Sequence, residues 1–319
     1  MTPMFDRLAL IGLGLIGSSI ARAARRHGLA RTIVAIDASA DVIARVEALG
    51  IADVTTRDLV TGVSGADCVI LCVPVGANAQ VAALIGPHLK PGAIVSDVGS
   101  VKGAVVRDVA PHLPAGVHFI PAHPVAGTEY SGPDAGFATL FENRWLVLTP
   151  PPDQDPDAIA TVQRFWEGLG SNVEIMSAQH HDLVLAITSH VPHLIAYNLV
   201  GTAYDLESVV EQEVIKFSAG GFRDSTRLAA SDPTMWRDVF LNNKEAVLEM
   251  VARFSEDLAA LARMIRWGDG DGLHDLFTRT RAIRRSIIAS GQDTAAPNFG
   301  RADGIAATPG RPGDPPISQ

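Results

Sequence analysis

The sequence is poor in cysteine. Its 319 residues include only two, Cys68 and Cys72, four positions apart in an apolar stretch. That spacing places both thiols on one face of a predicted strand, where cysteine is usually a core residue. A metal site would need further ligands at suitable spacing, and none is nearby. The sequence therefore predicts no metal site.

Basic residues are also scarce, and no apolar run is long. There are 26 Lys and Arg against 35 Asp and Glu, with no basic stripe, which argues against a nucleic-acid partner. The longest apolar run, residues 69–73, is too short to cross a bilayer. The first six residues lack the basic-then-apolar build of a signal peptide. We therefore expect a cytoplasmic protein that binds neither nucleic acid nor membrane.

The first half of the chain alternates short apolar strands with amphipathic helices. A hydrophobic content of 47% allows substantial cores, and the length suits two domains. Strands alternating with helices predict an α/β fold with a Rossmann-type, doubly wound parallel sheet over residues 1–177. The predicted strands are residues 7–11, 32–36, 68–73, 93–97, 117–121, 145–148 and 173–175.

The pattern then becomes helix after helix. We expect an all-helical substrate and dimerisation domain over residues 178–291, with Pro192 kinking its first helix. The predicted helices are residues 178–204, 207–217, 235–267 and 274–290. A long apolar-faced helix of this kind favours a homodimer. Residues 292–319 are rich in Pro, Gly, Ala and Asp without periodicity, so a disordered tail is predicted there.

A glycine-rich turn follows the first predicted strand and opens the first helix. It reads Gly12-Leu13-Gly14-Leu15-Ile16-Gly17. Gly12 allows the tight turn, Gly14 lets the backbone approach a pyrophosphate, and Gly17 lets helix and strand pack closely. The helix N-terminus then offers unpaired N–H groups and a favourable dipole to the phosphates. This context predicts a dinucleotide site; a βα turn without ligand is the alternative.

Asp37 ends the second predicted strand, about 25 residues after the loop begins. A carboxylate there can accept hydrogen bonds from both adenine-ribose hydroxyls and would repel a 2′-phosphate. No arginine immediately follows it, so NAD is favoured over NADP. Val73 and Pro74, after a later strand, are interpreted as shaping the nicotinamide half of the site.

Polar residues gather in five further segments: residues 97–102, 123–132, 189–193, 220–227 and 232–236. Together with the glycine loop, and in this order, the segments resemble the prephenate dehydrogenase family of tyrosine biosynthesis, which includes the arogenate and cyclohexadienyl dehydrogenases. The resemblance implies oxidative decarboxylation. Prephenate passes a hydride from ring C4 to NAD, loses its ring carboxylate as CO2 and gives 4-hydroxyphenylpyruvate; arogenate gives tyrosine.

The resemblance also implies catalytic roles. His123 matches the family's catalytic histidine, and a neutral imidazole is a suitable acceptor for the C4 hydroxyl proton. Without the resemblance, a histidine in a His-Pro turn is more often structural. Ser100 matches the serine or threonine that bonds this histidine and the substrate hydroxyl. It could equally, or at the same time, be the N-cap of a helix starting near Val101.

The substrate is a dicarboxylate, so its site needs cations and N–H donors. Arg227 matches the family's carboxylate-binding arginine, whose fork can form two parallel hydrogen bonds. For Arg223, one turn earlier, a surface salt bridge is favoured over substrate contact. His193 matches a pocket residue, and Ser189 is a weaker candidate. His190 is left open between pocket and packing.

Three further residues match family positions. Trp236 matches a tryptophan at the substrate end of the pocket, with core packing as an equal alternative. Glu129 matches an acidic residue near the entrance, where a plain surface charge is the alternative. Asp182 matches an acidic residue near the substrate side chain, where a carboxylate could pair with the ammonium of arogenate; a solvated helix surface is the alternative. This match favours a site that accepts arogenate, with or without prephenate.

Two other functions stay open. A β-hydroxyacid dehydrogenase would normally use a lysine of the helical domain, but Lys216 and Lys244 do not sit in that family's motif. A non-enzymatic NAD-sensing protein would bind NAD without turnover, and the joint presence of His123, Ser100 and Arg227 argues against it. No separate effector domain is visible in the sequence, so any inhibition by tyrosine is expected to be competitive.

Overall fold

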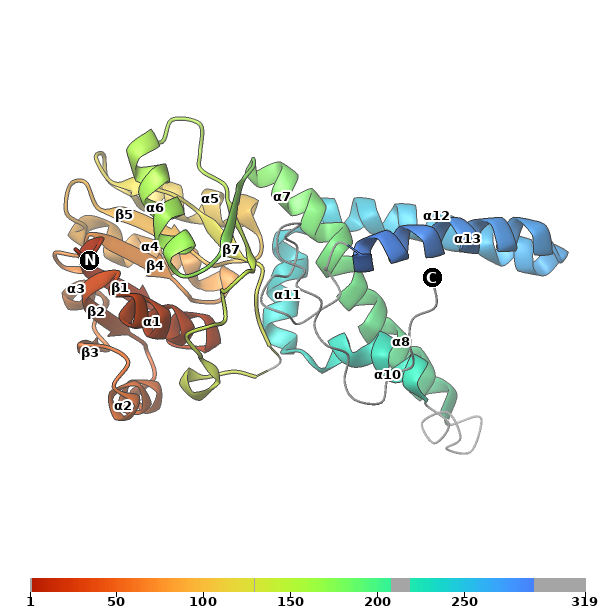
Figure 1. The fold of residues 1–319 in the computed structure, drawn as a ribbon, viewed down its shortest axis with the longest axis horizontal. Helices are drawn as coiled ribbons and strands as arrows, with labels where there is room; N and C mark the ends of the chain where they lie inside the picture. The colour runs from red at the N-terminus through yellow and green to blue at the C-terminus, as the bar shows by residue number, and fades with distance from the viewer. Residues whose placement is uncertain (1, 129, 208–218, 290–319) are drawn as a thin grey trace.

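The apolar strands near the N-terminus form the centre of a six-stranded parallel sheet in the computed structural model, which describes residues 2–128, 130–207 and 219–289 (Figure 1). The strand order is β3-β2-β1-β4-β5-β6, which is the doubly wound arrangement predicted. The strands are β1 (Phe5–Ile11), β2 (Ala30–Ile36), β3 (Val54–Thr56), β4 (Cys68–Leu71), β5 (Ile94–Asp97) and β6 (His118–Phe119). The short β3 was not predicted.

Helices cover both faces of this sheet, which explains why its strands are continuously apolar. Leu8 and Leu10 of β1 pack into one core cluster, while Ala9 and Ile11 pack into a second cluster on the opposite face. Both cysteines lie free in or beside these cores, as expected. The helices of this half are α1 (Leu15–His27), α2 (Ala40–Leu49), α3 (Leu59–Val63), α4 (Asn78–Ile85), α5 (Lys102–Val109) and α6 (Pro156–Gly168).

The last three strands form a separate sheet, which corrects the single parallel sheet that was predicted. They are β7 (Ala122–Pro124), β8 (Trp145–Leu148) and β9 (Asn172–Ile175); β7 pairs antiparallel with β8. The chain leaves the larger sheet at Pro121, which has no N–H to continue the ladder. The next N–H, on Ala122, bonds the Asp97 side chain instead of a strand.

The second half is helical, as predicted, but is divided differently. Its elements are α7 (Ala178–Leu185), a π-helical turn (Ala186–His190), α8 (Val191–Glu207), α10 (Gly220–Thr226), a 3-10 turn (Arg227–Ala230), α11 (Pro233–Asn242), α12 (Lys244–Trp267) and α13 (Gly270–Ala289). The interruption predicted at Pro192 takes the form of the π turn just before it. The single helix predicted over 235–267 is wrong, because Asn243 breaks it with non-helical dihedral angles. The helix predicted at 207–217, apart from its first residue, and the tail at 292–319 lie outside the described residues.

One helical stretch, Ala178–Leu206, has the length and apolar composition of a membrane span. The expectation that no segment could cross a bilayer considered only uninterrupted apolar runs. The same stretch, however, carries polar side chains that are buried against other parts of the protein. His181, Asp182 and His190 bond to β7, α5 and the residue before α12. Such contacts are typical of a helix packed within a protein.

Helices α12 and α13 form a long antiparallel hairpin that projects away from the sheets (Figure 1). Gly268, in the left-handed region at φ 69°, ends α12 and allows the chain to reverse. Large apolar side chains are exposed along the hairpin: Leu248, Phe254, Leu258, Ile265, Trp267, Phe277, Ile283, Ile287 and Ile288. This much exposed apolar surface is typical of a protein–protein interface.

The core of the first half should depend strongly on Trp166. This α6 side chain is fully buried and packs edge-to-face on Phe141 and Phe165. Trp166→Ala should lower the free energy of unfolding by about 3–5 kcal/mol. Trp166→Phe should cost much less, because it keeps a ring and removes an indole N–H that has no partner. Urea unfolding at one fixed protein concentration checks both; equal costs would contradict the packing argument.

Candidate active site

The glycine loop has the geometry that a dinucleotide site requires. Gly12 has φ +96°, and a Cβ there would lie 2.6 Å from the Cys72 carbonyl oxygen. A Cβ on Gly17 would lie 2.0 Å from the Gly12 carbonyl oxygen, so only glycine allows α1 to pack this closely on the loop. Around Gly14, the N-cap of α1, a Cβ would meet nothing within 4 Å. The loop is therefore closed toward the protein and open where a pyrophosphate would approach. Leu15 and Ile16 begin α1 behind it.

Asp37 lies directly after β2 and braces this loop. Its carboxylate accepts hydrogen bonds from the backbone N–H groups of Leu13 and Ser39, both at 2.9 Å. Each carboxylate oxygen keeps a further lone pair for a ribose hydroxyl. Arg57, which no sequence motif indicated, donates to the carbonyl oxygen of Ala38, next to Asp37. A carboxylate and a guanidinium thus lie close together beside the glycine loop.

Val73 and Pro74 follow β4 at the carboxyl edge of the sheet, next to the glycine loop. Val73 packs against one core cluster, and Pro74 is the N-cap of a short 3-10 turn, Val75–Ala77. Both positions suit the expected shaping role, and neither offers a polar side chain. Among the described residues, no group of three His, Cys, Asp or Glu could hold a metal ion.

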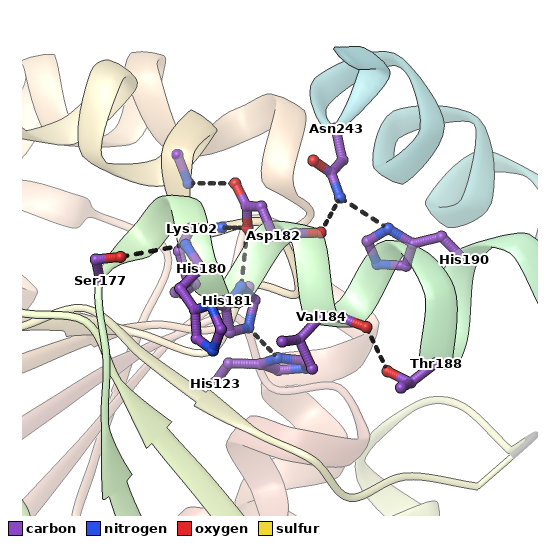
Figure 2. A network of polar contacts seen from close by, with 12 residues as sticks. Lys102, His123, Ser177, His180, His181, Asp182, Val184, Thr188, His190 and Asn243 are labelled. Atoms are coloured by element: carbon purple, nitrogen blue, oxygen red, sulfur yellow. Dashed lines mark hydrogen bonds and ion pairs between the residues drawn. The ribbon is translucent and has the colours of Figure 1, made fainter. Parts of the chain in front are cut away.

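His123 lies on β7 and is almost completely buried. Its Nδ1 is 2.8 Å from Nε2 of His181 on α7, 58 residues away in the chain (Figure 2). Within the described residues its Nε2 has no partner and is not sealed among buried atoms. Burial, followed by the charges of His181, Lys102 and His190, lowers the pKa of His123 well below its ordinary value. The ring is therefore neutral at pH 7.

Asp182 is bonded inside the protein, and its expected role as a partner for an ammonium group stays a prediction. It is 9% exposed, and its oxygens accept the backbone N–H groups of Lys102 and Gly103, both at 2.8 Å. Oδ1 is also 2.8 Å from Nδ1 of His181. The carboxylate is thus occupied by the first turn of α5 and by a histidine, and a solvated helix surface is excluded.

Ser100 does not serve as a helix cap. Helix α5 begins at Lys102, and its N-cap residue, Val101, has no capping side chain; Asp182 satisfies the first two N–H groups instead. Ser100 is half-buried at the carboxyl edge of the sheet, after β5. No hydrogen bond joins it to His123 in the part of the chain that the structure describes. Its role toward a substrate hydroxyl stays a prediction.

A buried ion pair supports the strand that carries His123. Nζ of Lys102, which is fully buried, bonds Oδ2 of Asp97 and the Ala122 carbonyl oxygen. Oδ1 of Asp97 accepts the Ala122 N–H at 3.1 Å. Burial lowers the pKa of Lys102, and Asp97 opposes that shift. The pair holds the residue next to His123 at both its N–H and its carbonyl group.

A second group of aromatic and polar side chains lies between α8 and α11. The rings of His193 and Trp236 stack with centroids 3.6 Å apart. Asn243 donates to the Asp182 carbonyl oxygen and to Nδ1 of His190, so the proton of neutral His190 is on Nε2. That Nε2 and the Trp236 indole nitrogen are both buried without a partner. Both nitrogens are enclosed by protein atoms. Burial lowers the pKa of His190 to about 4.

The remaining predicted residues are placed as follows. Arg227 is exposed at the end of α10. Burial lowers the pKa of His193, and the Arg227 charge lowers it further, so the two residues lie near each other. Arg223 pairs with the exposed Asp224, as favoured. Ser189 lies in the π turn and accepts at its carbonyl oxygen from His193. The predictions on Glu129 and Lys216 lie outside the described residues.

Comparison with known proteins decides the family. The family model for the nucleotide-binding domain of prephenate dehydrogenase matches residues 20–175, and that for its dimerization domain matches residues 177–279. The chain belongs to the prephenate dehydrogenase family. A cyclohexadienyl dehydrogenase of Zymomonas mobilis is 43% identical to it over 284 residues, which cover 89% of this chain and 97% of the relative.

Other family members agree with this assignment. A prephenate dehydrogenase of Bacillus subtilis is 33% identical over 288 residues, which cover 90% of this chain and 77% of the relative. A prephenate dehydrogenase of A. aeolicus, solved with hydroxyphenyl propionate and NAD+, is 34% identical with a TM-score of 0.84, covering 88% of this chain and 98% of that one. Synechocystis arogenate dehydrogenase is 27% identical with a TM-score of 0.76, covering 88% and 99%.

Removing the Asp37 carboxylate should change cofactor preference. Asp37→Ala should raise the Kd for NAD about tenfold, because it removes the acceptor of the ribose hydroxyls. Binding of NADP should weaken less or improve, since the anion is lost while Arg57 remains. Fluorescence titration with both cofactors measures the ratio. Asp41→Ala, at an exposed position in the first turn of α2, is the matched control; an unaltered ratio in Asp37→Ala would exclude this role.

Proposed function

We propose that this protein catalyses the NAD-dependent oxidative decarboxylation of prephenate, arogenate or both, within tyrosine biosynthesis. The observation that carries the proposal is the position of His123. It is a buried neutral histidine with one open ring nitrogen, at the junction of the half that holds the glycine loop and the helical half. Family membership and the named relatives support it. The β-hydroxyacid alternative loses support, because Lys244 is an exposed residue at the start of α12.

The residues suit the chemistry. NAD, bound at the glycine loop and Asp37, supplies the hydride acceptor. The substrate must then lose its C4 hydroxyl proton as the hydride leaves and the carboxylate departs as CO2. Nε2 of His123 has the free lone pair to accept that proton, and Ser100 can orient the hydroxyl. Burial excludes competing water and strengthens each interaction at this position.

The helical half suits the rest of the substrate. Arg227 is an exposed cation of the kind that a carboxylate needs, and its charge acts on His193. The stacked His193 and Trp236 rings offer a flat face to a six-membered ring. Ser189 is a further candidate contact. The Asp182 carboxylate bonds α5 and His181, so its contacts do not favour arogenate over prephenate.

Three further properties belong to this proposal. The exposed apolar face of α12 and α13, with the dimerization-domain match, supports a homodimer. Tyrosine, the product of arogenate oxidation, would compete at the same site, because it keeps the ring and the side-chain carboxylate. A cytoplasmic location stays a prediction.

Steady-state assays with prephenate, arogenate and 3-hydroxyisobutyrate test the function. Turnover with NAD of either of the first two is expected; turnover of 3-hydroxyisobutyrate alone, or of none, would overturn the proposal. His123→Ala should lower kcat by about 10²–10⁴, the usual contribution of a general base, and leave the Kd for NAD unchanged. His118→Ala, on the edge strand β6, is the control. Near-normal kcat in His123→Ala would exclude the base.

The pH dependence should reflect the lowered pKa of His123. Activity needs the neutral ring. Because its pKa is lowered, the His123 ring stays neutral at pH values below the pKa of an ordinary histidine. The acid limb of kcat/KM should therefore lie below pH 6.5, about the pKa of an ordinary histidine. Profiles from about pH 5 to 9 with a saturating cofactor measure it. An acid limb well above that value would show that another group or a raised pKa controls the rate.

A further inference from the structure

We infer that His181 and Asp182 are positioning residues, which hold the His123 proton on Nδ1 and leave Nε2 unprotonated to act as the base. The inference rests on the proposed function. It concerns a row of three side chains, Asp182, His181 and His123, joined end to end by two hydrogen bonds of 2.8 Å (Figure 2). The first two come from α7 of the helical half, and the third comes from β7.

The direction of each hydrogen bond follows from the group at the end of the row. The Asp182 carboxylate can only accept, so Nδ1 of His181 carries a proton. The pKa of His181 is lowered, mainly by burial, so this ring is neutral and its Nε2 must accept. Nδ1 of His123 therefore donates to it, and the one proton of neutral His123 is on Nδ1. Nε2 of His123 is then the lone pair that a general base needs.

The surroundings hold this arrangement in place. Asp182 is fixed by the backbone N–H groups of Lys102 and Gly103, and its own carbonyl oxygen accepts from Asn243. Because two backbone donors hold its carboxylate and a third donor holds its main chain, the carboxylate has little freedom to turn away from His181. His181 has no exposed surface, so no water can replace it as the partner of His123. The row is thus rigid and dry.

The charged and titratable groups around the row favour the same outcome. Those that act on its members are His181 and Asp182 on α7, Lys102 on α5, Asp97 on β5 and His190 in the π turn. The Lys102 ammonium disfavours a proton on His123. The Asp182 anion, reached through His181, is the group that can stabilise the imidazolium formed when His123 takes the substrate proton. Without it, a buried cation would form beside another cation.

Leucine and glutamine at position 181 separate this role from simple packing. The end of a glutamine side chain reaches about as far as Nε2 of histidine and offers a carbonyl acceptor, whereas leucine offers none. His181→Leu should lower kcat about 100-fold, while KM and the Kd for NAD stay within about twofold. His181→Gln should recover at least tenfold of that loss. His180→Leu, the exposed neighbouring histidine, is the matched control and should behave as wild type.

A variant that changes only the support of Asp182 tests the other end of the row. A Cβ on Gly103 would lie 2.8 Å from Oδ2 of Asp182, so Gly103→Ala must displace the carboxylate. Alanine is otherwise the better helix former. Gly103→Ala should lower kcat at least threefold with unchanged KM. Gly201→Ala, in α8, where a Cβ would meet nothing within 4 Å, should leave kcat unchanged.

The outcomes distinguish this inference from the proposed function. Wild-type turnover of neither prephenate nor arogenate would overturn the function itself. Wild-type turnover with unchanged kcat in His181→Leu would overturn only the positioning role. Equal losses in His181→Leu and His181→Gln, with thermal unfolding temperatures like that of the wild type, would overturn the acceptor argument. Should His181→Leu fail to fold, His181→Gln and Gly103→Ala still decide. A lower kcat with an unchanged KM supports the positioning role, and a change in both kcat and KM contradicts it.

Discussion

The contact on which the two halves depend is the carboxylate of Asp182 against the first turn of α5. Two backbone N–H groups, at the positive end of a helix dipole, meet one buried anion. An anion this deep in the protein is costly unless its oxygens are satisfied, and here three donors satisfy them. The same carboxylate orients His181, so the docking of the helical half and the state of the His123 ring depend on one side chain.

The larger sheet supplies the opposite face of this junction. Asp97 ends β5, where parallel strands present their carboxyl edge, and Lys102 starts the helix that follows. Either charge, buried without the other, would strongly destabilise the fold. The ion pair is completed by the N–H and carbonyl groups of Ala122, which Pro121 frees from the sheet. The start of a second sheet is thereby fixed one residue before His123.

Local patterns were enough to predict the cofactor half. The glycine loop and Asp37 lie within one βαβ unit, so spacing alone brings them together, and the structure shows Asp37 bonded to the loop. The junction could not be predicted in the same way. His181 and Asp182 are 58 residues or more from the groups they bond on β7 and α5, and a His-His-Asp run at a helix start has the polarity of a solvated surface. Family resemblance identified Asp182 as a site residue but gave no indication of its contacts with α5 and His181.

The π turn explains a further limit of periodicity. In a regular α-helix, His181 and His190, nine residues apart, would lie about half a turn from each other, since each residue turns the helix by about 100°. A π turn winds more slowly and reduces this separation. The charge of each histidine accordingly affects the same buried region, as the lowered pKa of His123 shows. One extra residue in a helical turn, which no apolar pattern reveals, thus lets α7 contact β7 while the next turn faces α11.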